Sequence, residues 1–298
     1  MPNSFTPFNP TTWSRIMVAI LREKCVMPGL INRDFEPDFA NPGDTVNTRK
    51  PGKFVSNPLT MGNDIVRQDA TATNIPIVLN NHEHVAFDVF DVEQSKSINQ
   101  LIELYMDPAM LAIAKAVDTS ILARYVDFTA LASSASAGGL KTAINNARTR
   151  LNKNLVPEDN RYLVLSDDDE GALAGIAQFE RSNETPTAGV TGGAITRIKG
   201  FQQTRSSNVA SVGSPAQRRN MALHRNAITL AVRPLPVTNA NGVTQIVRNE
   251  PDAGLSIRFT TGYDINKLRN TAVVDTVWGV KTLDAALAFV LPSTILAA

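Results

Sequence analysis

The segment from residue 43 to residue 92 constrains the fold most, because it is long, extended and poor in apolar residues. It begins at a turn over residues 42–44 and continues as a short strand. Residues 57–73 show no sustained hydrophobic period, and residues 75–92 read as extended again. We therefore expect a long two-stranded hairpin with a loose tip. A lone hairpin is marginally stable in water, so this one is expected to lie on another surface.

The best-defined helix follows the hairpin, in the sequence DPAMLAIAKAVDTSILARYV. Asp107 is the expected N-cap, and Pro108 occupies the first helical position, where its missing N–H costs nothing. The apolar stripe of this helix consists of Met110, Ile113, Ala114, Val117 and Ile121. Three charged residues are expected on its other faces, namely Lys115, Asp118 and Arg124.

Two more helices and several strands complete the prediction. One helix carries an apolar stripe of Trp13, Ile16, Met17 and Ile20 and stops at Pro28-Gly29. The other carries Leu140, Ile144, Ala147, Leu151 and Leu155 and ends before Pro157. Strands are expected in RYLVLS, AITRIKGFQQTRS, HRNAITLAVRPLP, LSIRFTTGYD and NTAVVDTVWGVKTL. Because the predicted helices come early in the chain and most predicted strands come late, the sequence predicts an α+β fold.

Charge and cysteine content exclude several classes of protein. The chain has 298 residues, with 29 basic against 28 acidic side chains, so no global field draws it to nucleic acid or to a membrane. The basic cluster QRRNMALHR has no aromatic residues between its arginines, so it does not predict specific recognition of nucleic acid. A phosphate contact that is independent of base sequence is the remaining alternative. A single cysteine, Cys25, rules out an intramolecular disulfide. The polar, proline-rich start and the short apolar tail predict neither a signal peptide nor a membrane span.

Two histidines, His82 and His84, flank a glutamate in NNHEHVAFDVFDVEQ, which raises the question of a metal site. In a strand, side chains alternate between two faces, so both histidines share a face with Asp88. The opposite face then carries Val85, Phe87 and Val89. A zinc site normally needs at least three protein ligands, and His224 lies far along the chain. The pattern favours a strand with a polar face, and no metal or cofactor is predicted.

The acidic run in LSDDDEGALAG is the other feature that suggests a metal. Carboxylates directly after a strand are typical of a helix N-terminus, with Ser166 or Asp167 as the cap. Calcium-loop spacing is absent, and neither G-x-S-x-G nor a phosphate-binding glycine motif occurs. No catalytic residue is therefore predicted. The alternative is a soluble metal-dependent enzyme that uses His82, His84 and residues 167–169.

The order of these elements resembles that of the major capsid (coat) proteins of tailed bacteriophages, from Trp13 to about Leu291. The resemblance rests on the hairpin beginning GDTV, the strand VAFDVFDVEQ and the helix AKAVDTSILARY. It continues in GGAITRIKGFQQTRSSNV, LHRNAITLAVRPL and YDINKLRNTAVVDTVWGVKTL. No single motif is specific to this family, but the order in which they occur along the chain is.

The resemblance implies a tailed-phage major capsid fold with an N-terminal arm, an extended β-hairpin loop, a peripheral domain with a long spine helix, and an axial domain. The corresponding boundaries are 1–40 for the arm, 41–95 for the loop, 96–135 for the peripheral domain, 136–254 for the axial domain, and 255–298 for the return strands and tail.

The resemblance also implies a function. The chain is expected to be a capsid subunit that forms pentamers and hexamers of an icosahedral shell around packaged double-stranded DNA, in the virion after assembly in the host cytoplasm. Expected partners are other copies of the chain, a separate scaffolding protein, a portal, decoration proteins and non-specifically contacted DNA. Inter-subunit contacts are expected from Lys50, Lys53, Phe54, Arg67, His82 and His84. A cellular encapsulating shell protein of the same fold is a further alternative.

Overall fold

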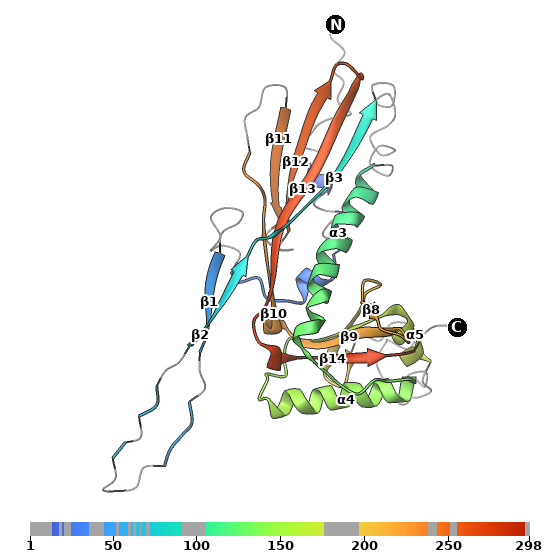
Figure 1. Cartoon of the computed structure of the whole chain (residues 1–298). Coiled ribbons are helices and arrows are strands. Elements are labelled where there is room, and N and C mark those ends of the chain that lie inside the picture. Colours follow the sequence, from blue (N-terminus) through green and yellow to red (C-terminus); the bar gives the residue numbers. More distant parts are fainter. Residues whose placement is uncertain are drawn as a thin grey trace.

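The computed structural model describes residues 14–17, 20, 25–35, 45–51, 54–58, 61, 64–65, 67–69, 72–90, 105–175, 197–237, 243–250 and 255–295. These residues form two β-sheets, helices that pack on them, and a two-stranded hairpin that projects away from both sheets (Figure 1). Short 3-10 helices lie at Met27–Gly29 (η1), Ala123–Asp127 (η5), Arg225–Ala227 (η6) and Ala285–Leu287 (η7).

A five-stranded antiparallel sheet and one long helix make up the elongated part of the molecule (Figure 1). Its strands are β3 (Asn81–Phe90), β10 (Ile228–Arg233), β11 (Val243–Glu250), β12 (Leu255–Asp264) and β13 (Arg269–Thr282). Strand β13 is the centre of this sheet, because it pairs with β12, β10 and β3. The predicted alternation in β3 is confirmed: Val85, Phe87 and Val89 pack into the core beneath helix α3 (Asp107–Leu122).

Helix α3 buries the whole predicted apolar stripe. The predicted N-cap is wrong, because Met106 is already helical and no side chain at the cap position accepts a hydrogen bond. The prediction that Asp118 lies away from the core is also wrong: this carboxylate is 1% exposed. In the described part of the chain, no helix is both long enough and apolar enough to cross a bilayer.

The buried Asp118 binds the segment that enters the fold from the N-terminal side. Its Oδ1 accepts the backbone N–H of Met27 at 3.1 Å, and its Oδ2 accepts that of Val26 at 3.2 Å. These are the free N–H groups at the start of η1, which a carboxylate satisfies well. Burial raises the pKa of Asp118 to about 6, although the two backbone hydrogen bonds act in the opposite direction.

A seven-stranded mixed sheet forms the second part of the molecule. Its strands are β4 (Thr129–Ala130), β5 (Arg161–Leu165), β6 (Arg197–Ile198), β7 (Phe201–Arg205), β8 (Ser211–Val212), β9 (Gln217–His224) and β14 (Ala288–Ser293). Helices α4 (Ala137–Lys153) and α5 (Asp167–Ala174) belong to this part. Leu163 and Leu165 face the α4 core, while Val164 faces the core around α3. Burial on both faces explains the continuous apolar run RYLVLS.

Chain segments that are distant in sequence share each sheet. Residues 136–254 supply most of the seven-stranded sheet and also β10 and β11 of the five-stranded sheet. Residues 255–298 supply β12 and β13 to one sheet and β14 to the other. The two parts therefore pack as one body with a shared core.

Helix α4 ends earlier than its apolar spacing predicts. The spacing predicts Leu155 on the buried face, but this residue lies beyond the helix, has a φ of 58° and is 89% exposed. The N–H of Val156 donates to the carbonyl of Leu151 at 3.1 Å, which is the hydrogen bond that closes a Schellman motif. This motif needs one residue in the left-handed region, and Leu155 takes the place that glycine usually fills.

The hairpin consists of β1 (Thr45–Pro51) and β2 (Ala72–Val78), paired from Thr45↔Val78 to Pro51↔Ala72. The predicted two-stranded excursion is confirmed, but it ends at Val78, whereas residues 81–90, which were predicted to belong to it, form β3 of the five-stranded sheet. At its base, Ile77 and Leu79 pack against Ala231 and Val277, which fixes β2 to the end of the five-stranded sheet.

Glycine at position 279 permits that attachment. A Cβ built on Gly279 would lie 2.2 Å from the carbonyl oxygen of Val78 and 3.3 Å from the Cα of Leu79. The chain that leaves the hairpin therefore crosses directly over β13 at this residue, where no side chain fits.

Gly279→Ala is expected to lower the free energy of unfolding by about 1–3 kcal/mol, because the backbone at Val78 must move or the strand pairing must open. Denaturant titration measures the change. Gly138→Ala is the matched control: its Cβ meets nothing within 4 Å, and alanine in a helix is expected to stabilise by about 0.5–1 kcal/mol. Equal stability of the two variants would contradict the backbone crossing.

Asp118 is expected to make stability depend on pH with a defined sign. The folded-state pKa lies above the ordinary value of 3.8, so the native state holds this proton more tightly than the unfolded state. The contribution of Asp118 to the free energy of unfolding is fully present below about pH 4. It is lost as the pH rises through about 6, and its magnitude is on the order of 3 kcal/mol. Unfolding of the wild type and Asp118→Asn at pH 4 and pH 7 measures it. A pH slope that the variant retains in full would assign the effect to another group.

Candidate assembly surfaces

The hairpin tip, defined as the described residues 54–58, 61, 64–65 and 67–69, exposes most of its apolar side chains. The exposed fractions are 65% for Phe54, 68% for Val55, 102% for Met61 and 79% for Ile65. Gln68 joins the two arms, because its side-chain amide accepts the N–H of Val55 at 2.9 Å and donates to the Val55 carbonyl. The tip thus presents apolar groups that its own chain leaves uncovered, which is typical of an interaction surface.

The predicted contact residues of the hairpin lie in different surroundings. Phe54 and Arg67 are exposed on the tip. Lys50 lies on β1, and its Nζ is 2.7 Å from Oδ2 of Asp284 in the same chain. Lys53 lies outside the described residues. Contact of these residues with another subunit remains a prediction.

His82 and His84 do not lie on the paired strands of the hairpin. Both belong to β3, where they stand opposite Val277 and Asp275 of β13. His82 Nε2 lies 3.2 Å from Oδ2 of Asp275, and the same carboxylate accepts the Nε–H of Arg258 at 3.0 Å. The sequence predicts the histidines on the hairpin, because residues 75–92 read as one extended segment. The crossing at Gly279 divides that segment into β2 and β3.

The described residues contain no group of three or more histidine, cysteine or acidic side chains that could hold a metal ion. His224 lies in the seven-stranded sheet, where it accepts the N–H of Asn226 at 3.2 Å and where burial lowers its pKa. Cys25 is partly buried, and burial together with the nearby Asp118 raises its pKa, so its thiolate is disfavoured.

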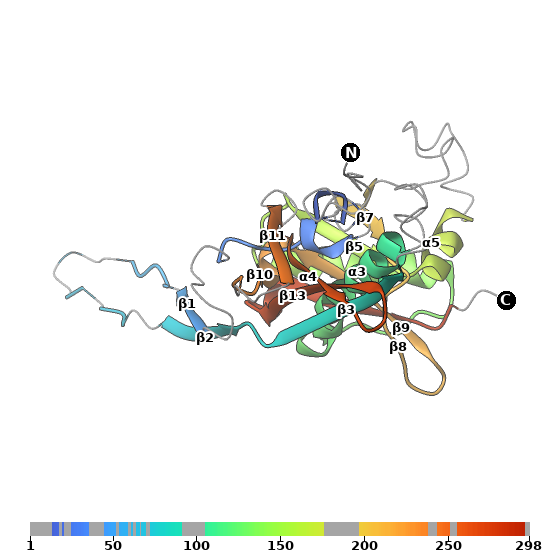
Figure 2. The same ribbon diagram turned by 90° about the horizontal axis from the view of Figure 1, so that it is seen from above.

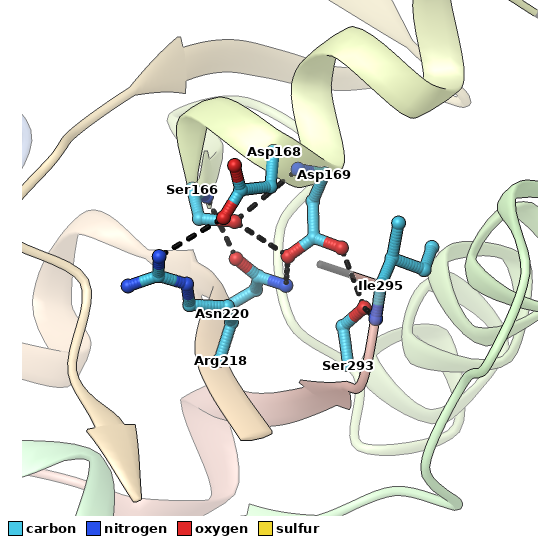
Figure 3. Close-up of polar contacts among 7 residues, drawn as sticks. All are labelled: Ser166, Asp168, Asp169, Arg218, Asn220, Ser293 and Ile295. Atoms are coloured by element: carbon cyan, nitrogen blue, oxygen red, sulfur yellow. Dashed lines mark hydrogen bonds and ion pairs between the residues drawn. The ribbon is translucent and has the colours of Figure 1, made fainter. Parts of the chain in front are cut away.

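The acidic run marks a helix N-terminus, and of the two predicted cap residues, Ser166 and Asp167, Ser166 is the N-cap of α5. Asp169 is fully buried and accepts hydrogen bonds from Ser166 Oγ at 2.6 Å, from Asn220 Nδ2 at 2.7 Å and from Ser293 Oγ (Figure 3). These contacts come from α5, β9 and β14, so one carboxylate joins three elements. Sequence reasoning identified the cap but missed Asn220 and Ser293, whose spacing carries no signal.

The basic cluster at β9 is largely occupied by contacts within the chain. Arg218 forms an ion pair with Asp168 at 2.9 Å (Figure 3). The guanidinium of Arg219 lies 6.0 Å from the ring centre of Tyr125, and Arg225 lies 4.0 Å from Asp34. This arrangement offers few free charges for a strong phosphate contact.

A cavity of about 880 Å³ lies beside α3, between the start of η1, the loop after β7 and the start of α5. Its wall includes the apolar side chains of Val26, Leu111 and Ala114. Its polar lining consists of Lys115, Asp118, Thr119, Asp167, Arg205, Ser206, Ser207 and Asn208. No sequence motif indicated this cavity, because its lining comes from four separate segments.

Comparison with known proteins identifies the fold through structure alone. No family model and no curated protein sequence matches the chain. A solved structure from Mycobacterium phage Che8 has a TM-score of 0.68 and 19% identity, over 90% of each chain. The capsid of cyanophage P-SCSP1u has a TM-score of 0.64 and 12% identity, over 91% of this chain and 89% of that one. The capsid of Myoviridae phage XM1 has a TM-score of 0.55 and 11% identity, over 90% of each chain.

Each of these likenesses covers about nine-tenths of this chain and of the compared chain. Identities this low establish the fold rather than the activity. The chain therefore has the α+β fold of the tailed-phage major capsid proteins, which is the fold that its sequence predicts.

Proposed function

We propose that the chain is a structural subunit of a phage capsid, which assembles into pentamers and hexamers and closes an icosahedral shell around packaged double-stranded DNA. The observation that carries this proposal is the hairpin of a capsid-like fold whose tip leaves Phe54, Met61 and Ile65 uncovered. A monomeric protein has no evident use for such a tip, whereas a shell subunit covers it with a neighbour. Its role is structural rather than catalytic.

In this proposal the elements take the roles that the resemblance implies. Helix α3 is the spine of a peripheral domain, the seven-stranded sheet is the body of an axial domain, and β1 with β2 is the extended loop. Each contact between subunits is modest, but many contacts form at once, so the closed shell becomes stable through multivalency.

The proposed partners follow the same reasoning. A separate scaffolding protein, a portal and decoration proteins act with this chain during assembly in the host cytoplasm and in the virion. The near-neutral charge, 29 basic against 28 acidic residues, supports a contact with DNA that is weak and sequence-blind.

Purified protein is expected to form capsomers, sheets or closed particles, alone or with its scaffolding protein, because the exposed tip needs a second subunit. Negative-stain electron microscopy and gel filtration distinguish these from a small discrete species. Deletion of residues 54–69 is the matched variant, and it is expected to abolish large assemblies. A monodisperse monomer under all assembly conditions would contradict the proposal.

Trypsin is expected to cleave the free subunit on the hairpin at Arg49 and Arg67, and to spare these sites in assembled particles. Both side chains are exposed in the single chain, whereas Lys50 is followed by Pro51 and is therefore resistant to trypsin. Arg161, which is 4% exposed, is the internal control and should resist cleavage in both states. Equal resistance of the hairpin sites in a stable monomer would show that the tip packs on its own chain.

A further inference from the structure

Helix α4 concentrates positive charge in a chain whose total charge is nearly balanced. Residues 128–157 contain no aspartate or glutamate, but they contain four cations, Lys141, Arg148, Arg150 and Lys153. The whole chain has 29 basic against 28 acidic side chains, so the other residues together have an acidic excess. The positive charge of α4 is therefore local, and the total charge conceals it.

We propose that the exposed face of α4 binds the phosphate backbone of double-stranded DNA. The inference rests on the proposed capsid function and specifies which part of the subunit contacts the packaged DNA. Recognition uses the regularly spaced negative charges of the duplex and is independent of its base sequence.

The cations of α4 lie on both flanks of its exposed face. The opposite face packs into the core of the seven-stranded part through Leu140, Ala143, Ile144, Ala147 and Leu151. Successive side chains of a helix are rotated by about 100°, so Lys141 and Arg148 lie on one flank. Arg150 and Lys153 lie on the other flank by the same rotation. The exposed face thus has a positive edge on each side.

A tight turn adds a fifth cation beside one of these edges. Strands β6 and β7 pair at Ile198↔Phe201, so Lys199 and Gly200 form a two-residue loop, with φ values of 51° and 89°. A Cβ built on Gly200 would lie 3.9 Å from Nε of Arg148, so the turn lies against this arginine. The exposed Lys199 therefore extends the positive edge that contains Arg148.

The charges of these cations are not neutralised by the described part of the chain. Arg148, Lys153 and Lys199 form no ion pair with another described residue. The guanidinium of Arg150 lies 5.9 Å from the ring centre of Phe289, a contact that leaves its positive charge in place. The basic cluster at β9 differs in this respect, because contacts within the chain occupy it.

The other side chains of this face favour a nucleic acid over a protein partner. From Lys141 to Lys153, every exposed side chain is polar, and Asn145, Asn146 and Thr149 belong to this set. The core of a protein interface is rich in apolar and aromatic groups, whereas DNA-binding surfaces are polar and positively charged. Helix α4 has no aromatic residue on which a base could stack, which is consistent with a contact to phosphates only.

The hairpin of the same chain does not cover this face. Helix α4 lies at the lower edge of the body in Figure 1, whereas β1 and β2 extend away from the body to one side in both views (Figures 1 and 2). The 17 residues of α4 give a length of about 25 Å at 1.5 Å per residue. A duplex therefore has access along the helix.

DNA binding by the full-length subunit at a series of salt concentrations tests the site. The probe is a fluorescently labelled duplex of mixed sequence, and its anisotropy reports binding. The logarithm of the association constant falls with the logarithm of salt concentration, with a slope of about −0.9 for each phosphate neutralised. Arg148→Gln combined with Lys153→Gln is therefore expected to reduce this slope by about 1.8 and to weaken binding about ten-fold at low salt.

Two matched variants separate this site from general effects of charge and folding. Lys115→Gln with Arg205→Gln removes two exposed cations elsewhere and is expected to leave the slope unchanged. Arg148→Lys with Lys153→Arg keeps both charges and is expected to retain the affinity within about two-fold. An equal loss of binding in the two glutamine variants would overturn the site, as would a wild type that does not bind DNA at low salt.

Closed particles give the second measurement, because the packaged DNA is inside the shell. Added duplex is expected to bind closed particles at least ten-fold more weakly than free subunits. Equal binding would place α4 on the outside and overturn the inference. Failure of the glutamine variant at positions 148 and 153 to assemble, with DNA binding retained, would instead assign this face to contact with another subunit. In all these cases wild-type particles form, whereas their absence would overturn the capsid function itself.

Discussion

Pairing of β13 with three other strands is the constraint on which the rest of the structure depends. This 14-residue strand binds β12 along one stretch, β10 along another and β3 on its opposite edge. A shift by one residue would turn Trp278 out of the core and break its 2.8 Å hydrogen bond to Ser120 on α3. It would also move Gly279 from beneath the hairpin. One strand therefore sets the register of the sheet, the position of the helix and the base of the hairpin.

Buried carboxylates connect the elements that backbone pairing does not reach. Asp169 joins α5, β9 and β14 around one side chain, and Asp118 holds η1 against α3. Burial of a charged group is unfavourable unless hydrogen bonds satisfy it, and each of these carboxylates accepts at least two. At Asp118, the effect of burial on the pKa is larger than that of the two backbone donors, so the pKa is raised.

The resulting molecule combines a firmly packed body with one element that extends beyond it. The body has a continuous core between both sheets, whereas the hairpin is attached to it by the packing of Ile77 and Leu79 and by the ion pair between Lys50 and Asp284. Such a division suits the proposed role as a shell subunit, because the body can keep its shape while the exposed tip contacts a neighbour.

Local pattern in the sequence determined the α3 stripe, the alternation of β3, the Ser166 cap and the extended hairpin, because these depend on residues that are near one another along the chain. The joint order of elements also indicated the capsid fold. Tertiary structure alone decided the burial of Asp118, the separation of β3 from the hairpin and the lining of the cavity. Each of these depends on contacts between residues that are distant in sequence, such as Val78 with Gly279, and no local period encodes such contacts.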